Sequence, residues 1–190
     1  MGRYLVCVTG ASGSVYGART IETLQRAGHE VHVVFSTWGA RVFETETGMS
    51  ADAWLANTGV PKDSVHAPDN LAACPSSGSW RLDGTVIVPC SMSTIGALAS
   101  GATTNLVHRA AAVALKEGRP LVLVPRETPW SLVDLRNLTA LAESGASILP
   151  ACPAFYHRPA TIDDMVNFVT GKILDRLGIQ HHLFDTWTGS

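Results

Sequence analysis

Clusters of small polar or charged residues follow the apolar, strand-like runs of this sequence, and their side chains are the ones that could do chemistry. The runs cover residues 4–8, 31–35, 85–89, 121–124 and 146–149. The clusters behind them are 9–13, 36–37, 90–94, 125–128 and 155–158. In an open parallel sheet, a ligand binds outside the carboxyl ends of the strands. We therefore expect these clusters to meet at one edge of a sheet and to form a ligand site there.

The first cluster combines glycines with a hydroxyl at the predicted start of a helix. Gly10 and Gly13 permit a tight turn and a close approach of the backbone to a ligand, and Ser12 adds a hydroxyl. A helix N-terminus adds unpaired N–H groups and a partial positive charge. The pattern indicates a cradle for a phosphate or a flavin, with a ligand-free strand–helix turn as the equal alternative. The spacing of Gly10, Gly13 and Gly17 differs from Gly-x-Gly-x-x-Gly, so the dinucleotide fingerprint is absent.

Three hydroxyls lie close together at the start of another predicted helix. They belong to Ser91, Ser93 and Thr94. Because one hydroxyl is enough to cap a helix, the other two favour a polar ligand over capping alone.

A charged pair, Arg126 and Glu127, stands between Pro125 and Pro129 directly behind an apolar strand. The prolines restrict the backbone and so fix where both charges point. An Arg guanidinium binds phosphate through two parallel hydrogen bonds. The Glu beside it is a proton acceptor or the ion-pair partner of the Arg, and a purely structural ion pair is the alternative.

Glu46 lies in the last turn of a predicted helix, where the helix dipole disfavours a carboxylate. A local rule broken in this way indicates function, although a solvated helix face is the commoner reason. Lys116 lies near the C-terminal end of an alanine-rich helix, where the helix dipole favours a positive charge. Its position therefore needs no functional explanation by itself.

Composition excludes several classes of protein. With 190 residues, 46% hydrophobic and 16% charged, the chain suits one well-packed domain with surface buried between subunits, and a monomer with a large core is the alternative. The formal net charge of -2, without any basic run, argues against nucleic-acid binding. The cysteines form no Cys-x-x-Cys pair and the histidines no His-x-x-x-His pair, so we predict no metal. No apolar stretch reaches the ~20 residues that span a bilayer, and no signal-peptide pattern precedes the first strand, so we expect a cytoplasmic protein.

Strand-like runs alternate with helical patterns, which is typical of a doubly wound, parallel α/β sheet with helices on both faces. The helical patterns cover residues 14–27, 38–47, 93–99, 105–117, 132–144 and 162–177. Residues 50–80 are predicted to hold a helix plus loops. We treat 1–190 as a single domain whose tail, 180–190, carries the aromatic residues Phe184 and Trp187 and docks on a neighbouring subunit.

Taken together, these segments resemble the flavin prenyltransferase family (UbiX type), formerly described as aromatic acid decarboxylases. The resemblance spans residues 6–187 in the expected order. The matching stretches are 9–17, 44–47, 76–79, 89–94, 109–117, 119–129 and 153–157. The run 119–129 and the triplet Phe155-Tyr156-His157 are its most specific parts.

The resemblance implies a flavodoxin-like, Rossmann-like fold that assembles into a homo-oligomer, usually a dodecamer, with FMN bound between subunits. Members of the family join a dimethylallyl group to N5 and the neighbouring ring carbon of reduced FMN. The donor is dimethylallyl monophosphate or, in some members, the diphosphate. The prenylated FMN then serves a partner decarboxylase of the UbiD type, and no metal is required.

The resemblance also implies roles for individual residues. FMN would be held by residues at the predicted sheet edge, namely Gly10, Ala11, Ser12, Ser36, Ser91, Met92, Ser93, Thr94 and Arg126. The phosphate of the prenyl substrate would be bound by Tyr156, Lys172, Arg109 and Lys116. Catalysis, including proton transfer, would fall to Glu127, Glu46, Lys116 and Ser12, and Trp187 would close over the substrate.

Two positions depart from the family pattern. Lys172 stands where the family commonly has Arg, which keeps the charge but loses the bidentate fork. Leu71 lies near a position where some members carry Trp.

Two other functions are alternatives. One is an FMN-dependent decarboxylase of the same fold, such as the peptidyl-cysteine type, and the other is a non-catalytic FMN carrier. The segment 89–93 differs from the Pro-Ala-Ser-Ala-Asn type of segment in those decarboxylases. Glu127, Lys116 and Tyr156 argue against a carrier, because storage of FMN needs none of them.

Overall fold

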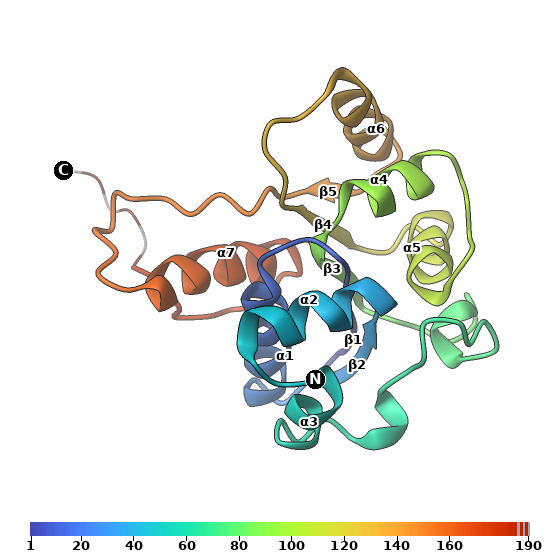
Figure 1. The fold of residues 1–190 in the computed structure, drawn as a ribbon, viewed down its shortest axis with the longest axis horizontal. Helices are drawn as coiled ribbons and strands as arrows, with labels where there is room; N and C mark the ends of the chain where they lie inside the picture. Colours follow the sequence, from blue (N-terminus) through green and yellow to red (C-terminus); the bar gives the residue numbers. More distant parts are fainter. Residues whose placement is uncertain (186, 188, 190) are drawn as a thin grey trace.

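The strands of the protein form one parallel sheet in a computed structural model, which describes residues 1–185, 187 and 189. Within this part of the chain the strand order is β2-β1-β3-β4-β5 (Figure 1). The strands are β1 (Arg3–Val8), β2 (Glu30–Phe35), β3 (Gly84–Cys90), β4 (Leu121–Pro125) and β5 (Ser147–Ile148). The chain passes from β1 to β2 on one side and then crosses to β3 on the other side, which is the flavodoxin-like order. The predicted doubly wound fold is confirmed.

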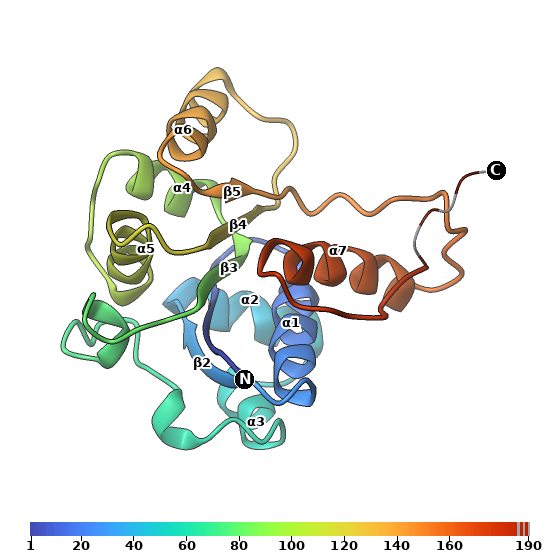
Figure 2. The same cartoon turned by 180° about the vertical axis from the view of Figure 1, so that it is seen from behind.

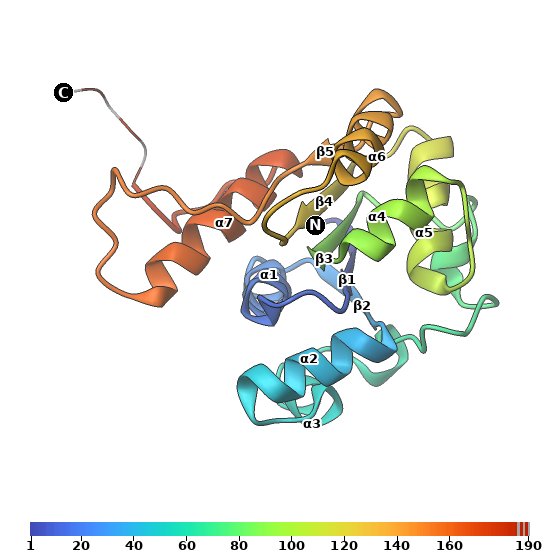
Figure 3. The same ribbon diagram turned by 45° about the horizontal axis from the view of Figure 1, so that its top comes forward.

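Helices cover both faces of this sheet. They are α1 (Ser14–Arg26), α2 (Thr37–Thr47), α3 (Ala51–Ala56), α4 (Met92–Ala99), α5 (Leu106–Lys116), α6 (Leu132–Glu143) and α7 (Ile162–Arg176). α1 and α7 pack together on one face, whereas α4, α5 and α6 lie on the other (Figures 1 and 2). α2 and α3 flank the β2 edge (Figure 3). Within the described residues, no helix has the length and apolar character needed to cross a bilayer.

The central strands are buried on both faces, which explains why they occur as continuous apolar runs in the sequence. In β1, Tyr4 and Val6 belong to the core on the α1 side, whereas Leu5 and Cys7 belong to the core on the α5 side. Burial raises the pKa of the Cys7 and Cys90 thiols, so both stay protonated. These two cysteines are therefore small apolar core residues, as the sequence indicates.

The ends of the elements follow local signals in most places. Gly28 and Gly48 follow α1 and α2 with φ values of 78° and 71°, a left-handed conformation that side chains disfavour. Residues 50–80 hold α3 and two short 3₁₀ turns, which agrees with the prediction of a helix plus loops. Of the predicted strand 146–149, only Ser147–Ile148 forms β5. β5 is an edge strand with one neighbour, and the following Pro150 has no N–H to donate.

Residues 150–161 and the first turns of α7 project away from the sheet, together with residues 180–185 (Figures 1, 2 and 3). We call residues 150–161 and 180–185 the arm. A Cβ at Gly171 would lie 2.4 Å from the Phe184 ring, so this glycine lets the arm pack closely on α7. Phe155 and Ile162 are 67% and 76% exposed.

Candidate functional site

The turn between β1 and α1 lies close to the start of α2. A Cβ at Gly10 would lie 2.6 Å from the Cβ of Trp38, so any larger residue would force the turn and α2 apart. Gly13 has φ 107°, outside the range that residues with side chains adopt easily. These two positions therefore require glycine, and the backbone of the turn stays open at the carboxyl edge of the sheet.

Glu46 reaches from the end of α2 to the beginning of α1. Its Oε1 accepts the N–H of Gly13 at 2.9 Å, and its Oε2 accepts the N–H of Ser14 at 2.8 Å. The carboxylate that is misplaced on its own helix therefore lies at the N-terminus of a neighbouring helix, where the dipole favours it. The structure assigns these two N–H groups to Glu46 and does not leave them for a phosphate.

The charge of Glu46 is stabilised by these contacts. Desolvation raises the pKa of this carboxyl, but hydrogen bonds from Ser12, Gly13 and Ser14 outweigh it and hold the pKa below its ordinary value. Glu46 is therefore ionised at neutral pH. The structure thus brings together Ser12 and Glu46, two of the predicted catalytic residues.

The turn between β3 and α4 presents the three predicted hydroxyls. Ser91 caps α4, because its Oγ accepts the N–H of Thr94 at 3.3 Å. The same Oγ lies 3.0 Å from Ser93 Oγ and 3.0 Å from Thr94 Oγ1. Ser93 is exposed, whereas Thr94 is buried. Capping uses only the Ser91 hydroxyl, so the exposed Ser93 hydroxyl is open to a ligand. Met92, which is also predicted to bind FMN, lies next to it in the chain.

Arg126 and Glu127 follow the end of β4. Arg126 Nε donates to the carbonyl oxygen of Ser12 at 2.8 Å and ties this strand end to the first turn. Glu127 Oε1 accepts the N–H of Thr128 at 3.1 Å. Among the described residues, Arg126 and Glu127 form no ion pair with each other. The alternative of a purely structural ion pair between these two residues is therefore not what the described residues form.

Ser36 completes the edge on the β2 side. Its N–H donates to the carbonyl oxygen of Val8 at 2.9 Å, and its Oγ accepts the N–H of Gly39 at 2.9 Å. The ends of β1, β2, β3 and β4 are thereby adjacent, and they bring together Gly10, Ala11, Ser12, Ser36, Ser91, Met92, Ser93, Thr94 and Arg126.

The residues predicted to bind the substrate phosphate are spread over the chain. Tyr156 is on the arm, with its ring 5.5 Å from that of Trp187 in an edge-on arrangement. Lys172 is on α7, where its Nζ lies 2.9 Å from a carboxylate oxygen of Asp175. It lines a cavity of about 430 Å³ beside Cys152. The structure places Trp187 against Tyr156, and its covering of the substrate stays a prediction.

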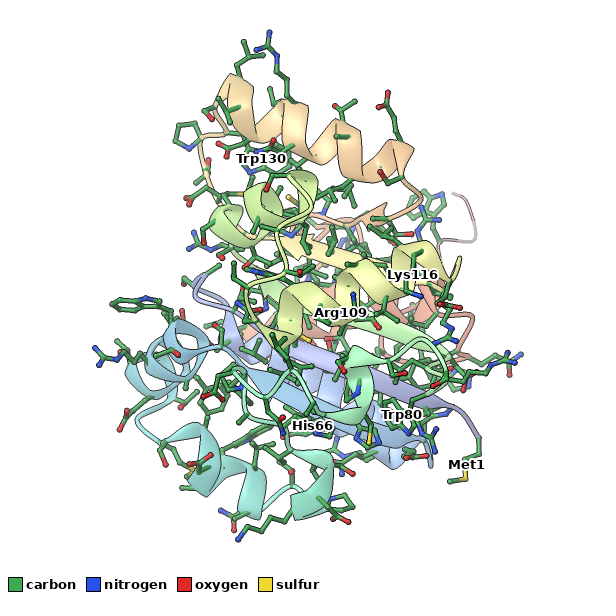
Figure 4. The ribbon with its side chains drawn as sticks, turned by 90° about the vertical axis from the view of Figure 1, so that its right-hand side faces the viewer. Met1, His66, Trp80, Arg109, Lys116 and Trp130 are labelled. Carbon is green, nitrogen blue, oxygen red and sulfur yellow. The ribbon has the colours of Figure 1, made fainter. Side chains whose placement is uncertain are left out.

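Two further predicted phosphate ligands lie on α5. Arg109 Nε donates to the carbonyl oxygen of Ser76 at 3.0 Å, and Lys116 pairs with its neighbour Glu117. Figure 4 shows Lys116 toward the side of the molecule on which Met1 lies, where β1 begins. α5 ends there because it leads into the start of β4. A single chain therefore does not bring Lys116 to the carboxyl edge of the sheet.

Sequence reasoning missed two residues of this edge. Trp38 stands in the first turn of α2, is 66% exposed and lies against Gly10. The signal was an aromatic residue directly behind the cluster 36–37. Thr9 is buried, and its hydroxyl contacts the turn between β3 and α4.

The sheet order and the polar turns at its carboxyl edge define a flavodoxin-like flavoprotein. The sequence profile of the family described as Flavoprotein matches residues 2–174. The flavin prenyltransferase UbiX of Halalkalibacterium halodurans is 44% identical over an alignment that covers 98% of this chain and 93% of that protein. The chain therefore belongs to the flavin prenyltransferase family.

Solved structures show the same likeness. AnUbiX in complex with FMN and dimethylallyl pyrophosphate has a TM-score of 0.94 at 39% identity, covering 100% of this chain and 98% of that one. A dodecameric FMN-dependent UbiX-like decarboxylase from Escherichia coli O157:H7 has a TM-score of 0.92 at 41% identity, covering 98% of this chain and 100% of that one. The peptidyl-cysteine decarboxylase EpiD, at 16% identity and a TM-score of 0.62, shares the fold alone.

Proposed function

We propose that this protein joins the dimethylallyl group of dimethylallyl monophosphate or diphosphate to reduced FMN and so makes prenylated FMN. The observation that carries the proposal is the set of polar turns at the carboxyl edge, in a chain that belongs to the flavin prenyltransferase family. Reduced FMN supplies a nucleophilic ring nitrogen and a neighbouring carbon as acceptors of the prenyl group.

The groups at the carboxyl edge fit FMN. Among the described residues, only Nε of Arg126 is engaged by the protein, which leaves both terminal nitrogens of its guanidinium for a phosphate. Ser93 adds an exposed hydroxyl at the start of α4. The glycine at position 10 lets a planar ring approach the backbone, and Trp38 stands beside it. We therefore propose that the FMN phosphate binds near Arg126 and the α4 turn, since Glu46 occupies the start of α1.

The prenyl phosphate must lose its bond to carbon, and the electron pair of that bond leaves with the phosphate. Cationic side chains aimed at the leaving phosphate stabilise the charge that develops on it. We assign this task to Lys172, Arg109 and Lys116, with the Tyr156 hydroxyl as a further donor. Aromatic walls such as Tyr156 and Trp187 would stabilise the allyl cation and exclude water.

The second bond to the flavin ring would need one proton delivered to the remaining carbon–carbon double bond of the prenyl group and one proton taken from the ring carbon, so an acid–base group must give one proton and accept one. Glu127 stands at the carboxyl edge, where its one hydrogen bond among the described residues comes from the N–H of Thr128 to Oε1. Glu46 is ionised and bound to Ser12. We propose that Glu127 and Glu46 accept and return protons, and that Ser12 links Glu46 to the reacting groups.

The complete site requires more than one copy of the chain. Lys116 lies away from the carboxyl edge of its own sheet, and the arm that carries Tyr156 extends outward. In a symmetric oligomer, the arm and α5 of neighbouring subunits would complete the site at the carboxyl edge of each sheet. We propose a homo-oligomer, a dodecamer like the E. coli O157:H7 protein, and a UbiD-type decarboxylase as the recipient of the prenylated FMN. The cytoplasm stays our predicted location.

The test is the mass of the flavin product. The protein is incubated without oxygen with FMN, a reductant and either phosphate ester, and the released flavin is examined by mass spectrometry. We expect a flavin heavier by one five-carbon unit. An unchanged flavin mass with both esters would refute the transferase and favour an FMN carrier. Loss of carbon dioxide from a cysteine-ended peptide would instead support the decarboxylase.

A further inference from the structure

Thr9 stands between β1 and the first turn of the carboxyl edge. It is 2% exposed, although its side chain is polar. A buried hydroxyl needs hydrogen-bond partners, because leaving it without them costs free energy.

The Thr9 hydroxyl joins the first turn to the α4 turn. Its Oγ1 donates to the carbonyl oxygen of Pro89 at 2.8 Å and accepts the N–H of Ser91 at 2.8 Å. The backbone N–H of Thr9 also donates to Pro89, at 3.2 Å, and its carbonyl oxygen accepts the N–H of Ala11 at 2.9 Å. Every polar group of Thr9 is therefore used, and one residue holds both turns.

These bonds begin where the pairing of the strands ends. β1 pairs with β3 from Tyr4↔Gly84 to Cys7↔Ile87. Beyond Ile87 the register of β3 against β4 also shifts. The backbone N–H of Thr9 still joins β1 to Pro89 at this point, and the Thr9 side chain adds a second bond to Pro89 and the connection to Ser91. Only a side chain with a donor and an acceptor on Cβ can serve both Pro89 and Ser91.

We infer that Thr9 is a positioning residue for FMN, which acts through Ser91 and the Gly10-Ala11 backbone and does not touch the flavin. This inference rests on the proposed FMN site. When Thr9 holds Ser91, the cap of α4 is fixed and the Ser93 hydroxyl points at a set place relative to the first turn. Without the bridge, each turn must be ordered when FMN binds, and affinity is lost.

The test compares three variants of the full chain. Thr9→Val keeps the shape and removes the hydroxyl, whereas Thr9→Ser keeps the hydroxyl. Thr85→Val is the matched control, because Thr85 is a buried threonine of β3 whose Oγ1 has no partner among the described residues. FMN affinity is measured by quenching of flavin fluorescence, and the melting temperature of each FMN-free protein is recorded alongside.

We expect the Kd for FMN to rise about tenfold in Thr9→Val, which corresponds to about 1.4 kcal/mol. The Kd for FMN of Thr9→Ser should stay within about twofold of the wild-type value. The Kd of Thr85→Val should equal the wild-type value. The absorption spectrum of flavin bound to Thr9→Val should also shift, since the hydroxyls around it are no longer held. A wild-type Kd and spectrum in Thr9→Val would overturn the inference. If Thr9→Val does not fold, Thr9→Ser decides, because a tenfold loss there would overturn the role of the hydroxyl.

Arg126→Ala separates this inference from the proposed site. If the FMN site is assigned correctly but Thr9 has no positioning role, Arg126→Ala weakens FMN binding and Thr9→Val does not. If FMN binds elsewhere, neither variant changes the Kd. A loss of affinity in both variants, with Thr9→Ser close to the wild type, supports both assignments.

Discussion

Replacement of Glu46 by Gln should destabilise the protein and do so only where the carboxylate is charged. Glu46→Gln keeps the length of the side chain and one acceptor oxygen, but it removes the charge at the start of α1. The wild-type carboxylate accepts N–H groups from Gly13 and Ser14 at 2.9 and 2.8 Å. In the variant, the side-chain amide oxygen can accept one of these N–H groups, whereas the side-chain NH₂ faces the other N–H group and cannot accept it.

The magnitude follows from these contacts. A hydrogen bond to a charged group contributes about 1.5–3 kcal/mol when buried, and the helix dipole adds about 0.3–1 kcal/mol. Glu46 is an exposed residue, so solvent screening reduces both contributions. We expect the free energy of unfolding to fall by about 1–2 kcal/mol at neutral pH. For a chain of this length, each kcal/mol lowers the melting temperature by about 2–4 °C.

The effect should depend on pH. The folded-state pKa of Glu46 lies below its ordinary value of 4.5. Its stabilisation is therefore fully present above that value and is lost as the pH falls through the folded-state pKa. The difference between wild type and Glu46→Gln should therefore stay constant from neutral pH down to 4.5 and shrink as the pH falls further.

The assay is thermal and denaturant unfolding of the FMN-free proteins at one protein concentration, because assembly contributes to stability. Glu44→Gln is the control, since it removes the same charge from an exposed position of the same helix. An equal loss in both variants, or a loss that persists unchanged at low pH, would refute the assignment of Glu46 to the α1 terminus.

Glu127→Gln should retain FMN but slow prenyl transfer by ~10²–10⁴-fold, and single-turnover mass analysis of the flavin checks this. Tyr156→Phe should raise KM for the prenyl phosphate, and Lys172→Ala should raise it further, because a charge-assisted contact is roughly twice as strong as a neutral one; the reverse order would contradict the phosphate assignment. Lys172→Arg should lower that KM by restoring the bidentate fork. Light scattering of the native protein should give the mass of a large oligomer, which a monomeric mass would contradict, and Trp187→Ala should weaken both assembly and substrate retention.

Much of the fold could be predicted because its signals are local. Gly28 and Gly48 end helices since they adopt a left-handed backbone, and Ser91 and Asn105 begin helices through their own side chains. The buried strands were recognisable because both of their faces are apolar. The short β5 was less predictable, since pairing at a sheet edge depends on what the neighbouring strand and Pro150 allow.

The order of elements, the family, and the convergence of the polar turns on one edge of a parallel sheet could all be predicted from the residues. All of these follow from residue types, local spacing and the rule that parallel strands end on the same side. Three placements became visible in the folded chain: Glu46 at the start of α1, Thr9 between two turns, and Lys116 away from the carboxyl edge. Each of these depends on how helices and turns distant in sequence pack against one another. Such placement is set by the burial of whole surfaces and is not encoded in any short stretch of residues.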